Sequence, residues 1–284
     1  MTLSADSVVR AMTNDGAFRV ITVRTTDTVR GAISAQHGIG HTARWFGELL
    51  TGAILIRETM APPLRVQGIL RGADGNGSLV ADSHPSGMTR GLIQLPEGDA
   101  QLDLEGAVLQ VMRTMPNGRI AQGVVGIPDS GGVSNALMAY MQISEQVVSA
   151  IAVSTVMEGE TVISAGGYIV QLLPEVGRGP LMIMTERLRD FDPIDRQLLS
   201  HDFSPQWLLD QILYGMPFTH LDESKVSFEC WCSEVRLMEA MATLSRTDIA
   251  DLVKGGELLE ISCDYCGKEY ALAPAQLRGL LESS

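Results

Sequence analysis

The sequence predicts an α+β protein with a core of mixed antiparallel sheet and helix, a helical linker and a small C-terminal domain. Three observations support this class. Hairpin patterns recur through the first part of the chain, apolar helical segments lie between them, and all four cysteines fall near the C-terminal end. A chain of 284 residues is long enough to bury one large core and a smaller one.

Two hairpins are predicted in the core region. Residues 63–72 and 77–84 alternate apolar with small or polar residues, and ADGNG joins them with glycines that suit a tight turn. Residues 108–114 and 119–125 are joined by MPNG, a second turn sequence. Two further apolar runs are typical of buried strands, at residues 147–156 and 166–174. Successive hairpins imply a largely antiparallel sheet.

Two helices lie between these strands. Residues 41–58 form a long apolar segment with Thr42 as its expected N-cap. Residues 134–144 form the second predicted helix, with Ser134 as its expected N-cap. The apolar side chains that share one face of this helix are Leu137, Met138 and Met141. With the hairpins, these helices define an α+β core domain over residues 1–180.

Residues 181–226 form the predicted linker, which is richer in charge and proline than the core. One helix is well marked within it, because Ser204 precedes Pro205 at the first helical position and Gly215 follows the last turn. A helix of some ten residues is unstable alone in water, so it must pack on a neighbour. The segment therefore consists of marginally stable elements. Its apolar run LMIMTERL suits either adaptable core packing or an apolar binding surface.

Residues 227–284 form a compact cysteine-bearing unit. Apolar residues at helical spacing predict a first short helix after Ser233. A second short helix is expected to end at Gly255 and Gly256, and a last helix to begin at Pro274. Two short strand candidates, ELLEI and EYALA, flank the last pair of cysteines. A unit of this size has a marginal hydrophobic core, so we expect an additional source of stability.

The cysteines form two close pairs, Cys230 with Cys232 and Cys263 with Cys266, and the 229 residues before them contain none. A CxxC followed by Gly267 is typical of a turn that directs two sulfur atoms toward one ion. Two such pairs supply four thiolates, which favour tetrahedral Zn²⁺. We therefore expect one Zn²⁺ per chain. Four electron-rich sulfur atoms are also open to oxidants, and loss of the ion would remove the main support of a small domain.

Other interpretations of the cysteines were considered. Unligated core cysteines are usually scattered rather than paired. A thioredoxin-like redox pair begins a helix after a strand, whereas strand-like residues follow CDYC here. A catalytic zinc site keeps an open position, which four cysteines do not leave. A permanent zinc fold that docks a partner, and a thiol–disulfide oxidoreductase, stay as alternative functions.

Other functional classes find little support in the sequence. The five histidines show no metal-binding spacing, since Gly38 and Gly40 interrupt the segment between His37 and His41. Motifs of hydrolases, nucleotide-binding proteins and metalloproteases are absent, so no enzymatic activity is expected. The net charge of −13 disfavours nucleic acid as a partner. No apolar run reaches the roughly 18 residues of a membrane span, and no secretory signal is visible, so we expect a cytoplasmic protein.

FECWCS and SCDYCGKEY resemble the zinc centre of the redox-regulated 33-kilodalton heat-shock chaperone family, whose pattern is C-x-C, about thirty residues, then C-x-x-C. Ser233 and Gly267 match residues common in that family. SEQ at 144–146 and GGYIVQLLP resemble family landmarks upstream, so the resemblance spans nearly the whole chain. Trp231 replaces a smaller or polar residue, and its bulky indole is expected either to shield the thiolates or to slow disulfide formation.

The resemblance implies an ATP-independent holdase that binds unfolded proteins after oxidation. In that family the reduced, zinc-bound form is inactive. Oxidation then forms disulfides, here implied between Cys230 and Cys232 and between Cys263 and Cys266. Zinc release, unfolding of the C-terminal domain and linker, exposure of apolar surface and homodimerisation follow. Unfolded client proteins are the implied partners.

Overall fold

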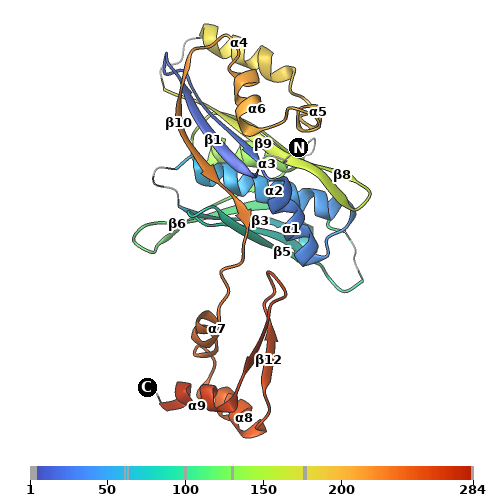
Figure 1. The fold of residues 1–284 in the computed structure, drawn as a ribbon, viewed down its shortest axis with the longest axis vertical. Coiled ribbons are helices and arrows are strands. Elements are labelled where there is room, and N and C mark those ends of the chain that lie inside the picture. The colour runs from blue at the N-terminus through green and yellow to red at the C-terminus, as the bar shows by residue number, and fades with distance from the viewer. Residues whose placement is uncertain are drawn as a thin grey trace. The chain divides into compact units, whose positions relative to one another are not determined.

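In the computed structural model, the chain divides into two compact units, residues 1–229 and 230–284. The described residues are 5–60, 62, 64–98, 101–128, 131–174 and 178–282. The first unit holds two β-sheets with helices packed on them, and the second holds a two-stranded sheet with helices (Figure 1). The predicted α+β class is confirmed. Residues 181–226 belong to the first unit, because the division between the units falls after Glu229.

The first sheet has five antiparallel strands in the order β10-β1-β2-β9-β8. Its strands are β1 (Ser7–Thr13), β2 (Phe18–Arg24), β8 (Ser149–Glu158), β9 (Thr161–Leu172) and β10 (Phe218–Lys225). The two apolar runs predicted as buried strands are β8 and β9, which pair with each other. β8 and β10 form the two edges of this sheet.

The second sheet has the order β11-β5-β4-β3-β6-β7. Its strands are β3 (Arg65–Arg71), β4 (Ser78–Ser83), β5 (Met88–Gln94), β6 (Val108–Thr114), β7 (Ile120–Gly126) and β11 (Ser227–Phe228). Both predicted hairpins are confirmed, as β3–β4 and β6–β7. The turn glycines Gly75, Gly77 and Gly118 all have positive φ, the conformation for which glycine is suited. The turn of the first hairpin includes the 3₁₀ segment η1 (Ala73–Gly75).

Three helices fill the space between the two sheets (Figure 1). They are α1 (Thr26–Gln36), α2 (Gly40–Glu58) and α3 (Val133–Ile143). One apolar cluster joins them to both sheets, and α2 is buried along most of its length, as its apolar sequence predicts. Even so, no helix in the described ranges is long and apolar enough to cross a membrane.

A second apolar cluster covers the other face of the first sheet. It is formed with α4 (Arg178–Arg189), α5 (Asp195–Leu198) and α6 (Pro205–Ile212). The alternation of β1 explains how one strand serves both layers, because Val8 points to the inter-sheet cluster while Val9 and Ala11 point to the second. Leu208, Leu209 and Ile212 of α6 are buried, so this helix packs on its neighbours as expected. Ser204 caps it by accepting a hydrogen bond from Trp207 N, and Pro205 is its first residue.

The cap predictions at Thr42 and Ser134 are wrong. Their helices begin two residues and one residue earlier, with Ile39 and Gly132 at the N-cap positions. Both hydroxyl groups instead form tertiary contacts: Thr42 Oγ1 accepts from Leu102 N at 2.8 Å and Ser134 Oγ accepts from Val153 N at 3.0 Å. The two hydroxyl groups therefore bind backbone N–H groups of other segments rather than those of their own helix ends.

The predicted helical character of residues 181–226 is incomplete, because this segment also contains β10. Most β10 side chains are exposed, so FTHLDESK lacks the apolar alternation that marks a strand. The strand is formed through its pairing with β1. Arg10 of β1 also forms ion pairs with both Asp222 of β10 and Glu58 of α2. β10 is thus stabilised by pairing with a distant strand and not by an apolar pattern of its own.

The run LMIM at the start of α4 is mainly a surface feature. Met184 is buried in the second cluster, whereas Leu181, Met182 and Ile183 are 40%, 71% and 55% exposed. Core packing, one of the two interpretations of this run, is observed for Met184 alone. The other three form an apolar surface on α4.

Close packing of α2 on the second sheet depends on Gly91 in β5. A Cβ at this position would lie 2.4 Å from Val80 O and 2.5 Å from the Phe46 ring. We predict that Gly91→Ala lowers the free energy of unfolding by about 1–3 kcal/mol, as overpacked cores do. Gly126→Ala is the control, since nothing lies within 4 Å of its added Cβ. Equal stability of the two variants in urea unfolding would contradict this assignment.

Glu48 gives the first unit a predicted pH dependence. Burial of this α2 side chain raises its pKa to about 7, although Arg44 Nε donates to the carboxylate at 3.0 Å. Between the ordinary value near 4.5 and pH 7, the folded chain holds a proton that the unfolded chain releases. Stability therefore falls as pH rises through this window.

We predict that Glu48→Gln removes this fall, so that the stability of the variant relative to wild type is about 1–3 kcal/mol greater at pH 8 than at pH 4.5. Exposed Glu97→Gln is the matched control and should follow the wild type. The measurement is urea unfolding of each protein across this pH range. A parallel pH profile for Glu48→Gln and wild type would overturn the prediction.

Candidate metal centre

The second cysteine pair lies in the turn of the C-terminal hairpin, between β12 (Leu259–Ser262) and β13 (Glu269–Leu272). Backbone hydrogen bonds close this turn, with Cys263 N donating to Lys268 O at 2.9 Å and Gly267 N donating to Cys263 O at 2.7 Å. Gly267 has a φ of 70°, which lets the chain double back. The CxxCG sequence thus forms the tight turn that its spacing predicts.

The first pair lies in the extended segment that precedes α7 (Glu234–Met241). Ser233 ends this segment, and its hydroxyl accepts a hydrogen bond from Arg236 N, so it caps the helix that was expected after it. The remaining helices of the unit are α8 (Arg246–Gly255) and α9 (Pro274–Glu282). Gly256 follows α8 at the C-cap position, and its left-handed conformation also agrees with the sequence.

The structure brings all four cysteines together. Their Sγ atoms lie within 4.8 Å of one another, and each thiol is half-buried. Cys230 Sγ lies 3.7 Å from Cys263 Sγ, and Cys232 Sγ lies 3.5 Å from Cys266 Sγ. Each contact joins one pair to the other across more than thirty residues of sequence. The four sulfur atoms could therefore hold one metal ion.

Tyr270 is part of this site although sequence reasoning did not identify it. Its hydroxyl group donates to Cys232 Sγ at 3.1 Å, and the Lys268 ammonium lies 5.1 Å from its ring centroid. Tyr270 belongs to β13, which follows the cysteine turn. The sequence did indicate that Tyr270 lies in a strand beside the cysteine turn. Only the fold shows that its side chain reaches the sulfur atom.

The four thiols differ in acidity. Burial raises the pKa of Cys232, but hydrogen bonds from Tyr270 and the neighbouring thiols outweigh it and lower the value to about 7. Burial raises the pKa of Cys263 and raises that of Cys266 to about 12, and neighbouring sulfur atoms contribute to both shifts. One thiolate thus forms readily, and further thiolates beside it are disfavoured. A bound cation would offset this repulsion, which is the electrostatic requirement of a four-thiolate metal site.

Histidines take no part in this cluster. His37 occupies the left-handed C-cap of α1, and His41 stacks on Trp45 with ring centroids 5.9 Å apart. Among the described residues, the four cysteines are the one group of three or more His, Cys, Asp or Glu side chains with metal-binding spacing. Trp231, between the first two cysteines, is half-buried.

A family model described as "Hsp33 protein" matches residues 6–273. This match spans both units and includes every cysteine. The chain belongs to the Hsp33 family. The resemblance inferred from the cysteine motifs is therefore confirmed.

Relatives support the assignment along the full length. A 33 kDa chaperonin of Shouchella clausii (strain KSM-K16) is 26% identical over 291 residues, covering 98% of each chain. The 33 kDa chaperonin of Bacillus subtilis (strain 168) is 27% identical, covering 98% of this chain and 99% of its own. The crystal structure of a 33 kDa chaperonin from Thermotoga maritima has a TM-score of 0.82 at 21% identity and covers 98% of both chains. Membership in this chaperone family is thus accompanied by the Hsp33 fold.

Proposed function

We propose that the protein is a redox-regulated, ATP-independent chaperone that holds unfolded client proteins after oxidation, in a cytoplasm that is normally reducing. Its Hsp33 membership supports a chaperone role. The observation that carries the regulatory part is the convergence of four thiols in the smaller unit. Neither catalytic turnover nor a nucleic-acid partner forms part of this proposal.

The geometry of the sulfur atoms supports one Zn²⁺ per reduced chain, held by Cys230, Cys232, Cys263 and Cys266. Tetrahedral coordination with Zn–S bonds near 2.3 Å sets sulfur atoms about 3.8 Å apart. Two cross-pair contacts, 3.5 and 3.7 Å, are close to this separation. When bound, the ion would offset two of the four thiolate charges and join the extended segment to the hairpin turn.

The smaller unit has little else to support its fold. Its apolar cluster has three fully buried members among the described residues, Ile249, Leu272 and Leu277. Zinc binding contributes about 10–16 kcal/mol in small zinc-binding peptides at neutral pH. Loss of the ion would therefore remove most of the stability of residues 230–284.

Oxidation provides the means of losing the ion. For each disulfide, two thiolates give two electrons to one molecule of peroxide, an S–S bond forms, and two protons complete two molecules of water. The sulfur atoms of a disulfide no longer bind the ion as thiolates do. Four cysteines thus consume two molecules of peroxide per chain.

We propose the pairing Cys230–Cys232 and Cys263–Cys266. All four sulfur atoms are close enough that proximity alone does not select partners. Pairing across the two segments would tie residues 230–232 to the hairpin turn and preserve their arrangement. Pairing within each segment leaves the two segments free to separate, so it agrees with an unfolding switch.

Client binding requires apolar surface, and the proposed linker, residues 181–226, contains part of it. Leu181, Met182 and Ile183 are already exposed on α4. The rest of this segment covers the second apolar cluster through residues such as Leu209 and Ile212. Unfolding of the linker would expose this cluster to unfolded clients, and to a second oxidised chain in a homodimer.

We predict that peroxide treatment of the reduced, zinc-loaded protein releases one Zn²⁺ per chain and activates it. A chromophoric chelator measures the metal, far-ultraviolet circular dichroism measures unfolding, and light scattering measures aggregation of a chemically unfolded enzyme. Oxidised protein should suppress aggregation, whereas reduced protein should not. Re-reduction with dithiothreitol and Zn²⁺ should reverse every change.

Two outcomes would reject the switch. Full retention of zinc after oxidation would favour a permanent zinc fold that docks a partner. Equal protection of the client by both forms would show that chaperone activity is independent of oxidation. Disulfide mapping by digestion and mass spectrometry tests the pairing separately, and bonds between Cys230 and Cys263 would contradict it.

Tyr270 should control the rate of oxidation. Its hydrogen bond withdraws electron density from Cys232 Sγ, which makes the sulfur a weaker nucleophile toward peroxide. We predict that Tyr270→Phe accelerates zinc release about fivefold, equivalent to loss of a hydrogen bond of ~1 kcal/mol. Tyr214→Phe in the first unit is the control, because Tyr214 is 76% exposed and lies outside the cluster. Unchanged kinetics in Tyr270→Phe would remove this role.

A further inference from the structure

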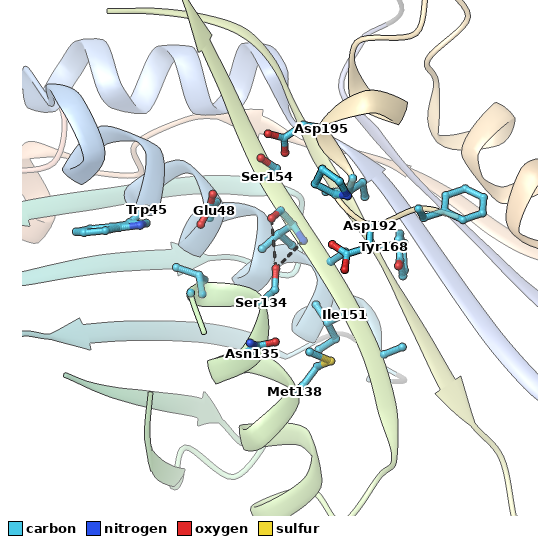
Figure 2. A pocket seen from close by; sticks show the side chains of 18 of the residues that line it. Trp45, Glu48, Ser134, Asn135, Met138, Ile151, Ser154, Tyr168, Asp192 and Asp195 are labelled. Atoms are coloured by element: carbon cyan, nitrogen blue, oxygen red, sulfur yellow. Dashed lines mark hydrogen bonds between the residues drawn. The ribbon is translucent and has the colours of Figure 1, made fainter. Parts of the chain in front are cut away.

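A pocket of about 480 Å³ lies in the first unit along the edge of β8 (Figure 2). Five consecutive β8 residues, 150–154, line it. Because successive residues of a strand point to opposite faces, a pocket lined by all five must follow the strand's edge. β8 is the last strand of the first sheet, so this edge has no neighbouring strand.

Hydrogen bonds show which β8 backbone groups face the pocket. Val148 O accepts from Leu172 N, so the backbone N–H and C=O groups of Val148 and of every second residue after it point toward β9. Val153 points the other way, since its N–H donates to Ser134 Oγ at 3.0 Å and its carbonyl oxygen accepts from the same hydroxyl group at 3.3 Å. Ile151 shares the orientation of Val153. Within the described ranges, no residue bonds the outward N–H or C=O of Ile151.

The two walls of the pocket come from different layers. In Figure 2, Glu48 and Ser134 lie on one side of the strand, and Tyr168 and Asp192 lie on the other. Aromatic side chains contribute to both walls, with Trp45 from α2 and Phe191 from the segment before α5. These walls flank the outward edge of β8 and leave space beside its backbone.

Acidic groups outnumber basic ones around the pocket. Arg44 is shared between two carboxylates, with Nε 3.0 Å from Glu48 Oε1 and a terminal nitrogen 3.4 Å from Asp195 Oδ2. Asp192 is exposed at the rim, and no described residue forms a hydrogen bond or ion pair with its carboxylate. Burial holds part of the Glu48 population neutral near pH 7, but Asp192 and Asp195 still leave an excess of negative charge. This charge complements a basic side chain.

We propose that the pocket binds an extended, basic segment of a partner polypeptide as an added strand on β8. The backbone of that segment would pair with the free N–H and C=O of Ile151, as in strand addition at other sheet edges. An arginine of the segment would lie against Asp192 and Asp195. The site is complete in the folded, reduced protein, so this binding is independent of activation by oxidation.

The probe is a fluorescein-labelled heptapeptide of alternating valine and threonine with one central arginine. Its binding to full-length, reduced, zinc-loaded protein is measured by fluorescence anisotropy. Glutamate in place of the arginine should weaken binding about tenfold, through loss of attraction and new repulsion. N-methylation of the peptide's alternate backbone nitrogens should weaken binding by a similar factor, because it removes the donors for β8. These changes leave the protein's fold untouched.

Two variants locate the site. Asp192→Asn should weaken binding of the arginine peptide and leave the glutamate peptide unaffected or better bound. Asp202→Asn is the matched control, since Asp202 is an exposed aspartate that does not line the pocket. Binding that is insensitive to N-methylation, or equally sensitive to Asp192→Asn and Asp202→Asn, would overturn the proposal.

The result is separable from the proposed chaperone function. Loss of peptide selectivity with intact suppression of aggregation by oxidised protein would reject the pocket alone. Selective peptide binding without oxidation-dependent suppression would reject the redox switch and keep the pocket.

Discussion

The convergence of four sulfur atoms within 4.8 Å is the constraint on which the smaller unit depends. It joins an extended segment before α7 to the turn between β12 and β13, in a unit whose apolar cluster is small. Such an arrangement is costly without a cation, because neighbouring thiolates repel one another. The same electrostatics that favours a metal makes the fold sensitive to any chemistry that consumes thiolates.

The larger unit is stabilised in a different way. Two apolar clusters pack on opposite faces of the first sheet, and strands such as β1 contribute to both through simple alternation. Stability there is distributed over many side chains, so no single bond determines it. The chain thus combines a core that resists local chemical change with a small unit that depends on one cluster.

Local sequence predicted much of this organisation. Short-range backbone requirements explain the hairpin turns at Gly75, Gly77 and Gly118. They also explain the helix cap at Ser204 and the cysteine turn at Gly267. Elements that depend on tertiary partners could not be predicted in the same way. β10 exists because β1 pairs with it, Thr42 and Ser134 serve distant backbone groups, and Tyr270 meets Cys232 only after β13 pairs with β12. These contacts carry no periodic signal in the sequence.

The pairing of β1 with β10 also has a consequence for synthesis on the ribosome. β1 ends at Thr13, whereas its partner begins at Phe218, so the first sheet lacks one edge until most of the chain has been made. The free edge of β1 is a template for pairing with other chains during that interval. Since Cys263 and Cys266 follow β10 in the sequence, β10 can pair with β1 before the four-cysteine site is complete. The order of the chain therefore places synthesis of the strands of the core ahead of synthesis of the proposed sensor.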